Sequence, residues 1–229
     1  MQVHRLINSP VDSNCFVIVG NNDNSCIVID PGTENCEELL AFIESHNLSV
    51  QYCFLTHEHI DHIIGCNVLK KHYPQVKLVC SDLCAKNLNN TRFNLSRLEE
   101  HFTSRDSFPF PDLTYSNKLM FEWQGEKVLF LKAMGHSQGS SIALIGENLF
   151  VGDTFIYHYK TTTTLPGASR QDLVETFDSL LNDFCNESII VYPGHFDSCK
   201  LSEMKKELLP QSIKIKRILE RKHLDNGKE

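Results

Sequence analysis

The stretch Thr56–Gly65, THEHIDHIIG, constrains this chain more than any other segment. It places three histidines and two carboxylates within a few residues, directly after an apolar run that is typical of a short buried strand. Apolar residues recur at helical spacing downstream, so the cluster lies where a strand ends and a helix begins. His57 and His59 can converge on one ion, whereas Asp61 and His62 enter the helix and point elsewhere. One loop can therefore supply ligands to two adjacent metals, and imidazole with carboxylate suits zinc, iron or manganese.

Four more polar residues stand directly after strand-like runs. Asp30 follows the third apolar run, where Pro31 and Gly32 stop the strand. The other three occur in G-H-S, G-D and Y-P-G-H motifs, as His136, Asp153 and His195. Each is presented at a strand end, where a side chain is free to face a shared site.

These motifs, H-x-H-x-D-H, G-H-S-x-G, G-D and Y-P-G-H, resemble the ligand motifs of the metallo-β-lactamase-fold hydrolases. The resemblance covers about residues 1–197 and is closest to the glyoxalase II-like (hydroxyacylglutathione hydrolase-like) branch. It implies an α/β fold of four layers, an αββα sandwich, with the metal site at one edge between the two sheets.

The resemblance also implies two divalent metal ions, for which we expect Zn²⁺, with iron or manganese as alternatives. It implies that Asp61 is also the catalytic carboxylate. Asp30 would orient the metal loop by accepting the distal N–H of a ligand histidine, although a turn or helix-capping role remains open. Seven side chains would hold the ions: for the first, His57, His59 and His136; for the second, Asp61, His62 and His195; and, as the bridge, Asp153.

Two ions about 3.5 Å apart would share a water whose pKa falls to near neutrality, which supplies a bridging hydroxide. The resemblance therefore implies hydrolysis of a thioester, lactone or related ester. A phosphodiesterase or nuclease of the same fold and a mononuclear iron persulfide dioxygenase stay open as alternatives.

Three features depart from glyoxalase II. Ser140 stands where those enzymes often have histidine. A four-threonine run, 161–164, replaces their G-R-x-D-type pattern. Only 34 residues follow His195, too few for their complete glutathione-binding domain.

Residues 82–117 are the least regular part of the chain, and we expect a lid-like segment there. In F-P-F-P, Phe108 and Phe110 are carried on a rigid backbone and are candidate substrate contacts, with a satellite core as the alternative. His158, in the loop after Asp153, is a third candidate, with a solvated loop residue as the alternative. Residues from about 200 to 229 predict a basic helical tail, broken at Pro210.

Local patterns predict the order of the elements. Val3–Ile7, Cys15–Val19 and Cys26–Ile29 predict an antiparallel meander of three strands. Helical periodicity over 37–46 and 66–73 alternates with strands, which gives β-α-β-α-β within the first 80 residues and favours one layered α/β domain.

The length of 229 residues fits a single domain over 1–229. The net charge of −7 argues against a nucleic-acid partner, and a metal site left at about +1 favours a small anionic substrate. We find no signal peptide and no apolar stretch of membrane-spanning length. Nine scattered cysteines without a C-x-x-C pair predict reduced thiols and a cytoplasmic protein.

Overall fold

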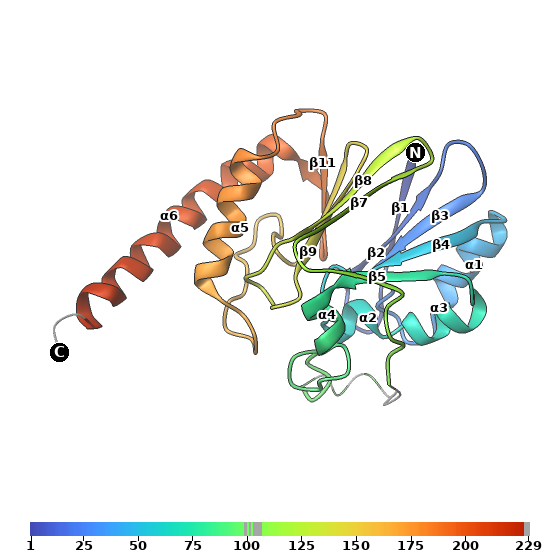
Figure 1. Cartoon of the computed structure of the whole chain (residues 1–229), viewed down its shortest axis with the longest axis horizontal. Coiled ribbons are helices and arrows are strands. Elements are labelled where there is room, and N and C mark those ends of the chain that lie inside the picture. The colour runs from blue at the N-terminus through green and yellow to red at the C-terminus, as the bar shows by residue number, and fades with distance from the viewer. Residues whose placement is uncertain (99, 101, 103–106, 227–229) are drawn as a thin grey trace.

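A computed structural model describes residues 1–98, 100, 102 and 107–226, and its framework is two six-stranded sheets (Figure 1). The first sheet contains, in spatial order, β1 (Gln2–Ile7), β2 (Asn14–Val19), β3 (Ser25–Ile29), β4 (Ser49–Phe54), β5 (Lys77–Ser81) and β6 (Leu113–Tyr115). The second contains β12 (Cys199–Lys200), β11 (Ile190–Pro193), β10 (Asn148–Gly152), β9 (Ser141–Ile145), β8 (Glu126–Lys132) and β7 (Lys118–Trp123).

Helices cover the outer face of each sheet (Figure 1). Against the first sheet lie α1 (Glu37–Ser45), α2 (Ile60–Ile63), α3 (Cys66–His72) and α4 (Asp82–Asn87). Against the second lie α5 (Arg170–Asn182) and α6 (Leu201–Asn226). The predicted αββα sandwich is therefore confirmed.

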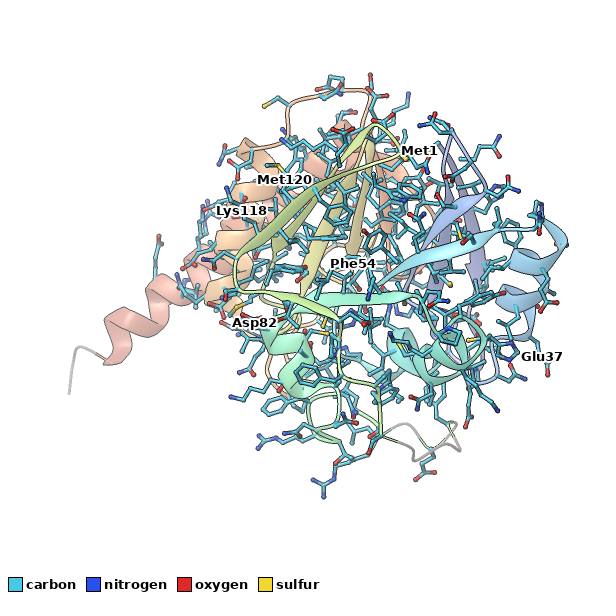
Figure 2. All side chains as sticks on the ribbon, turned by 45° about the vertical axis from the view of Figure 1, so that its right-hand side comes forward. Met1, Glu37, Phe54, Asp82, Lys118 and Met120 are labelled. Carbon is cyan, nitrogen blue, oxygen red and sulfur yellow. The ribbon has the colours of Figure 1, made fainter. Side chains whose placement is uncertain are left out.

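Three apolar clusters hold the four layers together. In β2, Cys15 and Val17 point to the helices, whereas Phe16 and Ile18 point to the other sheet. Because both faces of these strands are buried, their sequences are continuously apolar rather than alternating. Between the sheets, Phe54, which is labelled in Figure 2, stacks on Phe130 with ring centroids 4.4 Å apart.

The structure bears out the N-terminal meander, since β1, β2 and β3 pair antiparallel. It corrects the expected break at Pro210, because α6 continues through this residue. Pro210 is exposed, and the helix on its N-terminal side is anchored in the core by Met204 and Leu208, so packing overrides the local cost of proline.

The segment 82–117 contains α4 and β6, and residues 99, 101 and 103–106 of the expected lid lie outside the described residues. Among the described helices, none combines the length and apolarity needed to cross a membrane.

One edge of the sandwich collects the ends of several strands. In the first sheet β3 and β4 are parallel, so both end at this edge, and β2 begins there. In the second sheet β8, β10 and β11 run in one direction and end there too. The topology thus brings residues from distant parts of the sequence to one place.

Candidate metal centre

Three histidines form the first group at this edge. His57 and His59 follow β4, and His136 comes from the loop between β8 and β9. Nδ1 of His59 lies 3.1 Å from Nε2 of His57 and 3.1 Å from Nε2 of His136. Nitrogens that share a tetrahedral zinc ion at about 2.1 Å lie about 3.4 Å from one another. The three rings are therefore arranged to share one ion.

Asp61, His62 and His195 form the second group. Oδ2 of Asp61 lies 3.3 Å from Nε2 of His62 and 3.4 Å from Nε2 of His195. Asp61 and His62 belong to α2, whereas His195 follows β11 through Gly194. This group of one carboxylate and two imidazoles has the composition of a second metal site.

Asp153, directly after β10, stands between the two groups. Its Oδ2 lies 3.6 Å from Nε2 of His136 and 3.4 Å from Nε2 of His195, and its Oδ1 lies 3.6 Å from Nε2 of His62. A single carboxylate therefore faces one histidine of the first group and two of the second, which is the position of a bridge.

Unpartnered atoms show that these residues fit divalent ions. His62 Nε2 and Asp153 Oδ1 are buried without a hydrogen-bond partner among the described residues, although they face each other. Buried polar atoms are ordinarily hydrogen-bonded, and an exception needs a physical reason. Imidazole nitrogen and carboxylate oxygen are the donors that zinc, iron and manganese take, so bound cations would satisfy both atoms.

The charges in the second group agree with this fit. Burial alone would lower the pKa of His62, but Asp61 and Asp153 raise it well above its usual value. The two carboxylates likewise overcome burial at His195 and raise its pKa to about 10. In the first group, burial and the neighbouring histidines lower the pKa of His57 and bring that of His59 to about 3. Asp61 and Asp153 thus favour a positive charge at this site, which a metal ion would supply, while His57 and His59 are kept neutral, as metal ligands must be.

Asp30, at the end of β3, supports the loop from behind. Its Oδ2 lies 3.0 Å from Nδ1 of His62 and accepts a 2.6 Å hydrogen bond from the Thr56 hydroxyl. Its Oδ1 accepts the Thr56 amide at 2.8 Å. These contacts hold the outer nitrogen of His62, so that Nε2 is turned toward Asp61 and Asp153.

The loop between β1 and β2, together with the first residue of β2, supports the same site, although the sequence did not indicate this. The Ser13 hydroxyl donates to the Asp61 carbonyl at 2.6 Å, and the Asn14 amide group donates to the Pro193 and Phe196 carbonyls at 2.9 and 2.8 Å. Nδ1 of His195 lies 3.0 Å from the Asp12 carbonyl. These hydrogen bonds therefore connect the segment that carries Asp61 with the segment that carries His195.

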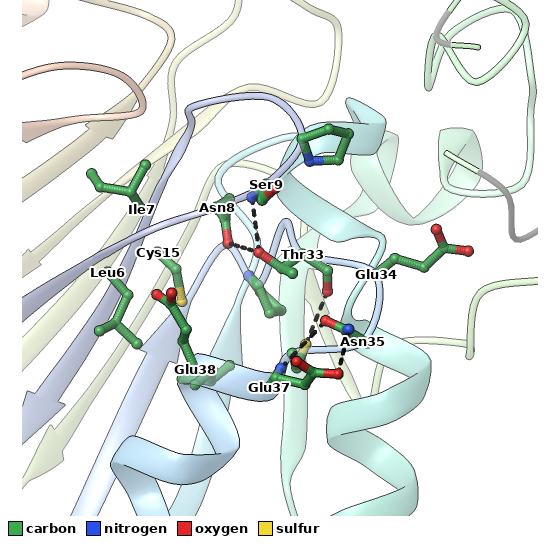
Figure 3. Close-up of a pocket in the computed structure, with 14 residues that line it drawn as sticks. Leu6, Ile7, Asn8, Ser9, Cys15, Thr33, Glu34, Asn35, Glu37 and Glu38 are labelled. Carbon is green, nitrogen blue, oxygen red and sulfur yellow. Dashed lines mark hydrogen bonds between the residues drawn. The ribbon is translucent and has the colours of Figure 1, made fainter. Parts of the chain in front are cut away.

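Asn8 extends this network to the loop after β3. Its side chain accepts hydrogen bonds from Gly32 N and the Thr33 hydroxyl, at 3.0 and 3.2 Å, and donates to the Asp30 carbonyl at 3.1 Å. Figure 3 shows Asn8, Ser9 and Thr33 side by side, at a pocket that also exposes Glu34, Glu37 and Glu38.

Glu58 is another residue to which the sequence assigned no role. Its side chain is fully buried and accepts hydrogen bonds from Asn87 and Ser137 at 3.1 and 2.8 Å. Glu58 is part of the H-x-H motif, but its hydrogen-bond partners lie 29 and 79 residues away in the sequence, so no local pattern indicates them. Glu58 thus connects the first histidine loop to the loop that carries His136.

The remaining predicted residues lie apart from these groups. Phe108 packs partly buried against the core under the first sheet, and Phe110 is 82% exposed. His158 is exposed, with Nδ1 2.8 Å from Glu207 of α6. That Phe108, Phe110 and His158 contact the substrate remains a prediction. Ser140 is buried and accepts a hydrogen bond from the Ser137 amide, so it shapes the turn after His136.

Comparison with known proteins adds independent findings. A family model described as the metallo-beta-lactamase superfamily matches residues 8–195. A probable metallo-hydrolase from Streptococcus pyogenes serotype M6 is 28% identical over 208 residues, 90% of this chain and 88% of that protein. A hydroxyacylglutathione hydrolase from Aliivibrio salmonicida is 31% identical over 146 residues, 62% of this chain and 47% of that protein. The chain thus spans about half the length of this relative.

Solved structures share the fold. The BLEG-1 B3 metallo-beta-lactamase matches with a TM-score of 0.77 and 20% identity, over 88% of this chain and 95% of that chain. TTHA1623, solved in a di-iron-bound form, matches with a TM-score of 0.67 and 23% identity, over 87% of this chain and 96% of that chain. Likeness at these identities concerns the fold alone.

Proposed function

The chain belongs to the metallo-beta-lactamase superfamily, and we propose that it is a metal-dependent hydrolase of acyl thioesters or related esters. The observation that carries the proposal is the pair of side-chain groups with Asp153 between them. Such an arrangement suits two adjacent divalent ions and needs no serine or cysteine nucleophile.

In this proposal each residue has a defined task. His57, His59 and His136 would hold one ion, Asp61, His62 and His195 would hold the other, and Asp153 would contribute to both. When bound, the ions supply activation of water and polarisation of the carbonyl that is attacked. Asp30 and the Asp12 carbonyl keep the rings of His62 and His195 in register.

Asp61 has a further task in orienting the attacking water. Its side chain is 15% exposed, compared with 10% for Asp153 and 2% for Asp30. Of these three carboxylates, it therefore reaches solvent most readily.

Two observations support the substrate class. The 31% identity over 146 residues to a hydroxyacylglutathione hydrolase favours thioester chemistry. The net charge of −7 repels a nucleic-acid backbone at long range, so we propose a small anionic substrate instead.

The test is a panel of substrates on protein reconstituted with zinc, manganese or iron. The panel compares a glutathione thioester, a simple acyl thioester, a lactone and bis(p-nitrophenyl) phosphate. We expect the highest kcat/KM with a thioester. A phosphodiester that is tenfold better, about 1.4 kcal/mol in activation free energy, would refute the proposed class. Oxygen consumption with a persulfide, and only with iron, would instead establish the dioxygenase alternative.

The metal is proposed to be zinc, because the nitrogen-rich first group suits it well. TTHA1623 binds two irons on the same fold, so iron is the specific alternative. Elemental analysis of protein purified without added metal distinguishes the two.

A further inference from the structure

A second concave surface lies beside the metal centre, on the side of the second sheet. It is a pocket of about 410 Å³ formed by the loop 160–164, by Arg170 at the start of α5, and by Gln211, Lys214 and neighbouring residues of α6. Figure 1 shows α5 and α6 next to each other over this sheet. We call it the threonine pocket, because four of its lining residues are Thr161–Thr164. Its volume lies within the usual range for small-molecule sites.

The threonine pocket is cationic, although the whole chain is acidic. Lys160, Arg170 and Lys214 line it, and no carboxylate does. None of the three makes an ion pair with a described residue, whereas Lys216, close by on α6, pairs with Asp178 at 2.8 Å. The pocket of about 350 Å³ in Figure 3 has the opposite character, with Glu34, Glu37 and Glu38 in its lining. The positive charge in the threonine pocket is therefore local and uncompensated.

Hydroxyl and apolar groups complete this surface. The side chains of Thr161 and Thr163 are already hydrogen-bonded within the protein. The Thr161 hydroxyl donates to the Thr154 carbonyl at 2.8 Å, and the Thr163 hydroxyl accepts from Arg170 at 3.2 Å. Thr162 and Thr164 are exposed and make no side-chain hydrogen bond to a described residue, so their hydroxyls are free for a ligand. Ile215 and Ile218 supply a half-buried apolar wall. The lining thus suits a ligand with both anionic and apolar parts.

The same loop connects the threonine pocket to the metal centre. Thr154 directly follows Asp153, and the bond from Thr161 fixes the loop to it. The Thr162 carbonyl lies beside the His136 ring. One side of the loop therefore meets the first histidine group, and the other side lines the pocket.

We propose that the threonine pocket binds the anionic tail of the substrate's thiol half, through its carboxylates or phosphate, with the tail's carbon chain against Ile215 and Ile218. The identity of this tail as part of a thioester rests on the proposed function. The threonine run replaces the G-R-x-D-type pattern of glyoxalase II, and together with Arg170 and Lys214 it forms this pocket. In this proposal, these residues recognise the acidic thiol.

Binding measured without turnover tests this directly. Isothermal titration would use S-methylglutathione, which carries carboxylates, 4′-phosphopantetheine, which carries a phosphate, and neutral S-methyl-N-acetylcysteamine. We expect submillimolar binding of one charged probe, weakened by salt, and at least tenfold weaker binding of the neutral probe. The charged probe that binds distinguishes carboxylate from phosphate. Absence of binding by both charged probes would overturn the proposal.

Variants locate that binding. Lys160→Gln/Lys214→Gln removes two exposed charges that make no hydrogen bond to described residues, and should weaken the charged probe at least tenfold. Arg170→Gln should also weaken it, and Arg170→Lys should recover most of the loss. Lys206→Gln, an exposed cation on α6 outside the lining, is the matched control and should bind like the wild type. Equal binding by the double variant and the wild type would refute the site.

Hydrolysis gives a separate readout. In the double variant, the ratio of kcat/KM for S-acetylglutathione over S-acetyl-N-acetylcysteamine should fall at least tenfold if carboxylates are recognised. For a recognised phosphate, S-acetyl-4′-phosphopantetheine takes the place of the first substrate. If wild-type protein hydrolyses no thioester but still binds a charged probe through these cations, the proposed function fails and the anion site stands.

Discussion

Asp153 lies between the two groups of proposed ligands, because its oxygens face His62, His136 and His195. We predict that Asp153→Asn, which keeps the shape and removes the charge, lowers bound metal from two ions per chain to one or fewer and reduces kcat/KM at least 100-fold. Elemental analysis measures the stoichiometry. The exposed Asp183→Asn is the control, and an unchanged metal content in Asp153→Asn would contradict the bridging position.

Glu58 makes a different single-residue prediction, since it contacts no proposed substrate. Its buried oxygens accept hydrogen bonds from Asn87, Ser137 and Gly139. In Glu58→Gln an amide NH₂ must face these donors, so we expect a loss of about 1–3 kcal/mol in unfolding free energy and weaker metal binding. Urea unfolding and competition with a metal chelator measure the two effects. Ser137→Ala, which removes only one donor, should have the smaller effect on both.

At the scale of elements, the end of β11 shows how closely a strand approaches the site. A Cβ on Gly194 would lie 2.1 Å from Oδ1 of Asp153 and 3.0 Å from the backbone carbon of Gly152. We predict that Gly194→Ala displaces Asp153 and lowers metal content. Gly125→Ala tests strain alone, because Gly125 has φ of 78° and a Cβ there would meet no atom within 4 Å, and it should cost about 1 kcal/mol with full metal content. Full metal binding by Gly194→Ala would show that the strand end can adjust.

Helix α6 contains an internal Pro210, which lacks the N–H that an interior helical residue donates. We predict that Pro210→Ala raises the unfolding free energy by about 1–3 kcal/mol, because proline is about 3 kcal/mol less favourable than alanine in a helix interior. Urea unfolding measures the change, and the exposed Lys206→Ala on the same helix should shift it by less than about 0.5 kcal/mol. A destabilised Pro210→Ala would mean that the helix depends on a bend at this residue.

For the whole molecule, the proposed ions should act as folding ligands. Both sheets supply ligands to one edge, so a metal that binds only the folded state stabilises it by mass action. We predict that a chelator lowers Tm by at least 5 °C and that one added equivalent of zinc or iron per vacant position restores it. Circular dichroism follows the transition. A Tm that is insensitive to chelation, with metal loss verified, would contradict this linkage.

Sequence alone determined the types of residue at the site and their positions at strand ends. Apolar runs followed by Pro, Gly or a polar cluster are local signals, and they located Asp30, His57, Asp153 and His195 without knowledge of the fold. The αββα class came from the resemblance that these motifs carry. The structure has this fold, and its central strands are apolar on both faces because helices cover one face and the second sheet covers the other.

Only the tertiary structure decided which atoms face each other. Glu58 and Ser137 are 79 residues apart, and Asn14 and Pro193 are 179 apart, so no local pattern relates them. The threonine run was visible as composition, but its cationic partners Arg170 and Lys214 come from two other elements. The unbroken α6 was decided in the same way, because burial of Met204 and Leu208 outweighs the local preference of Pro210. Hydrogen bonds and packing between distant segments depend on the whole fold, and these are the contacts that complete the site.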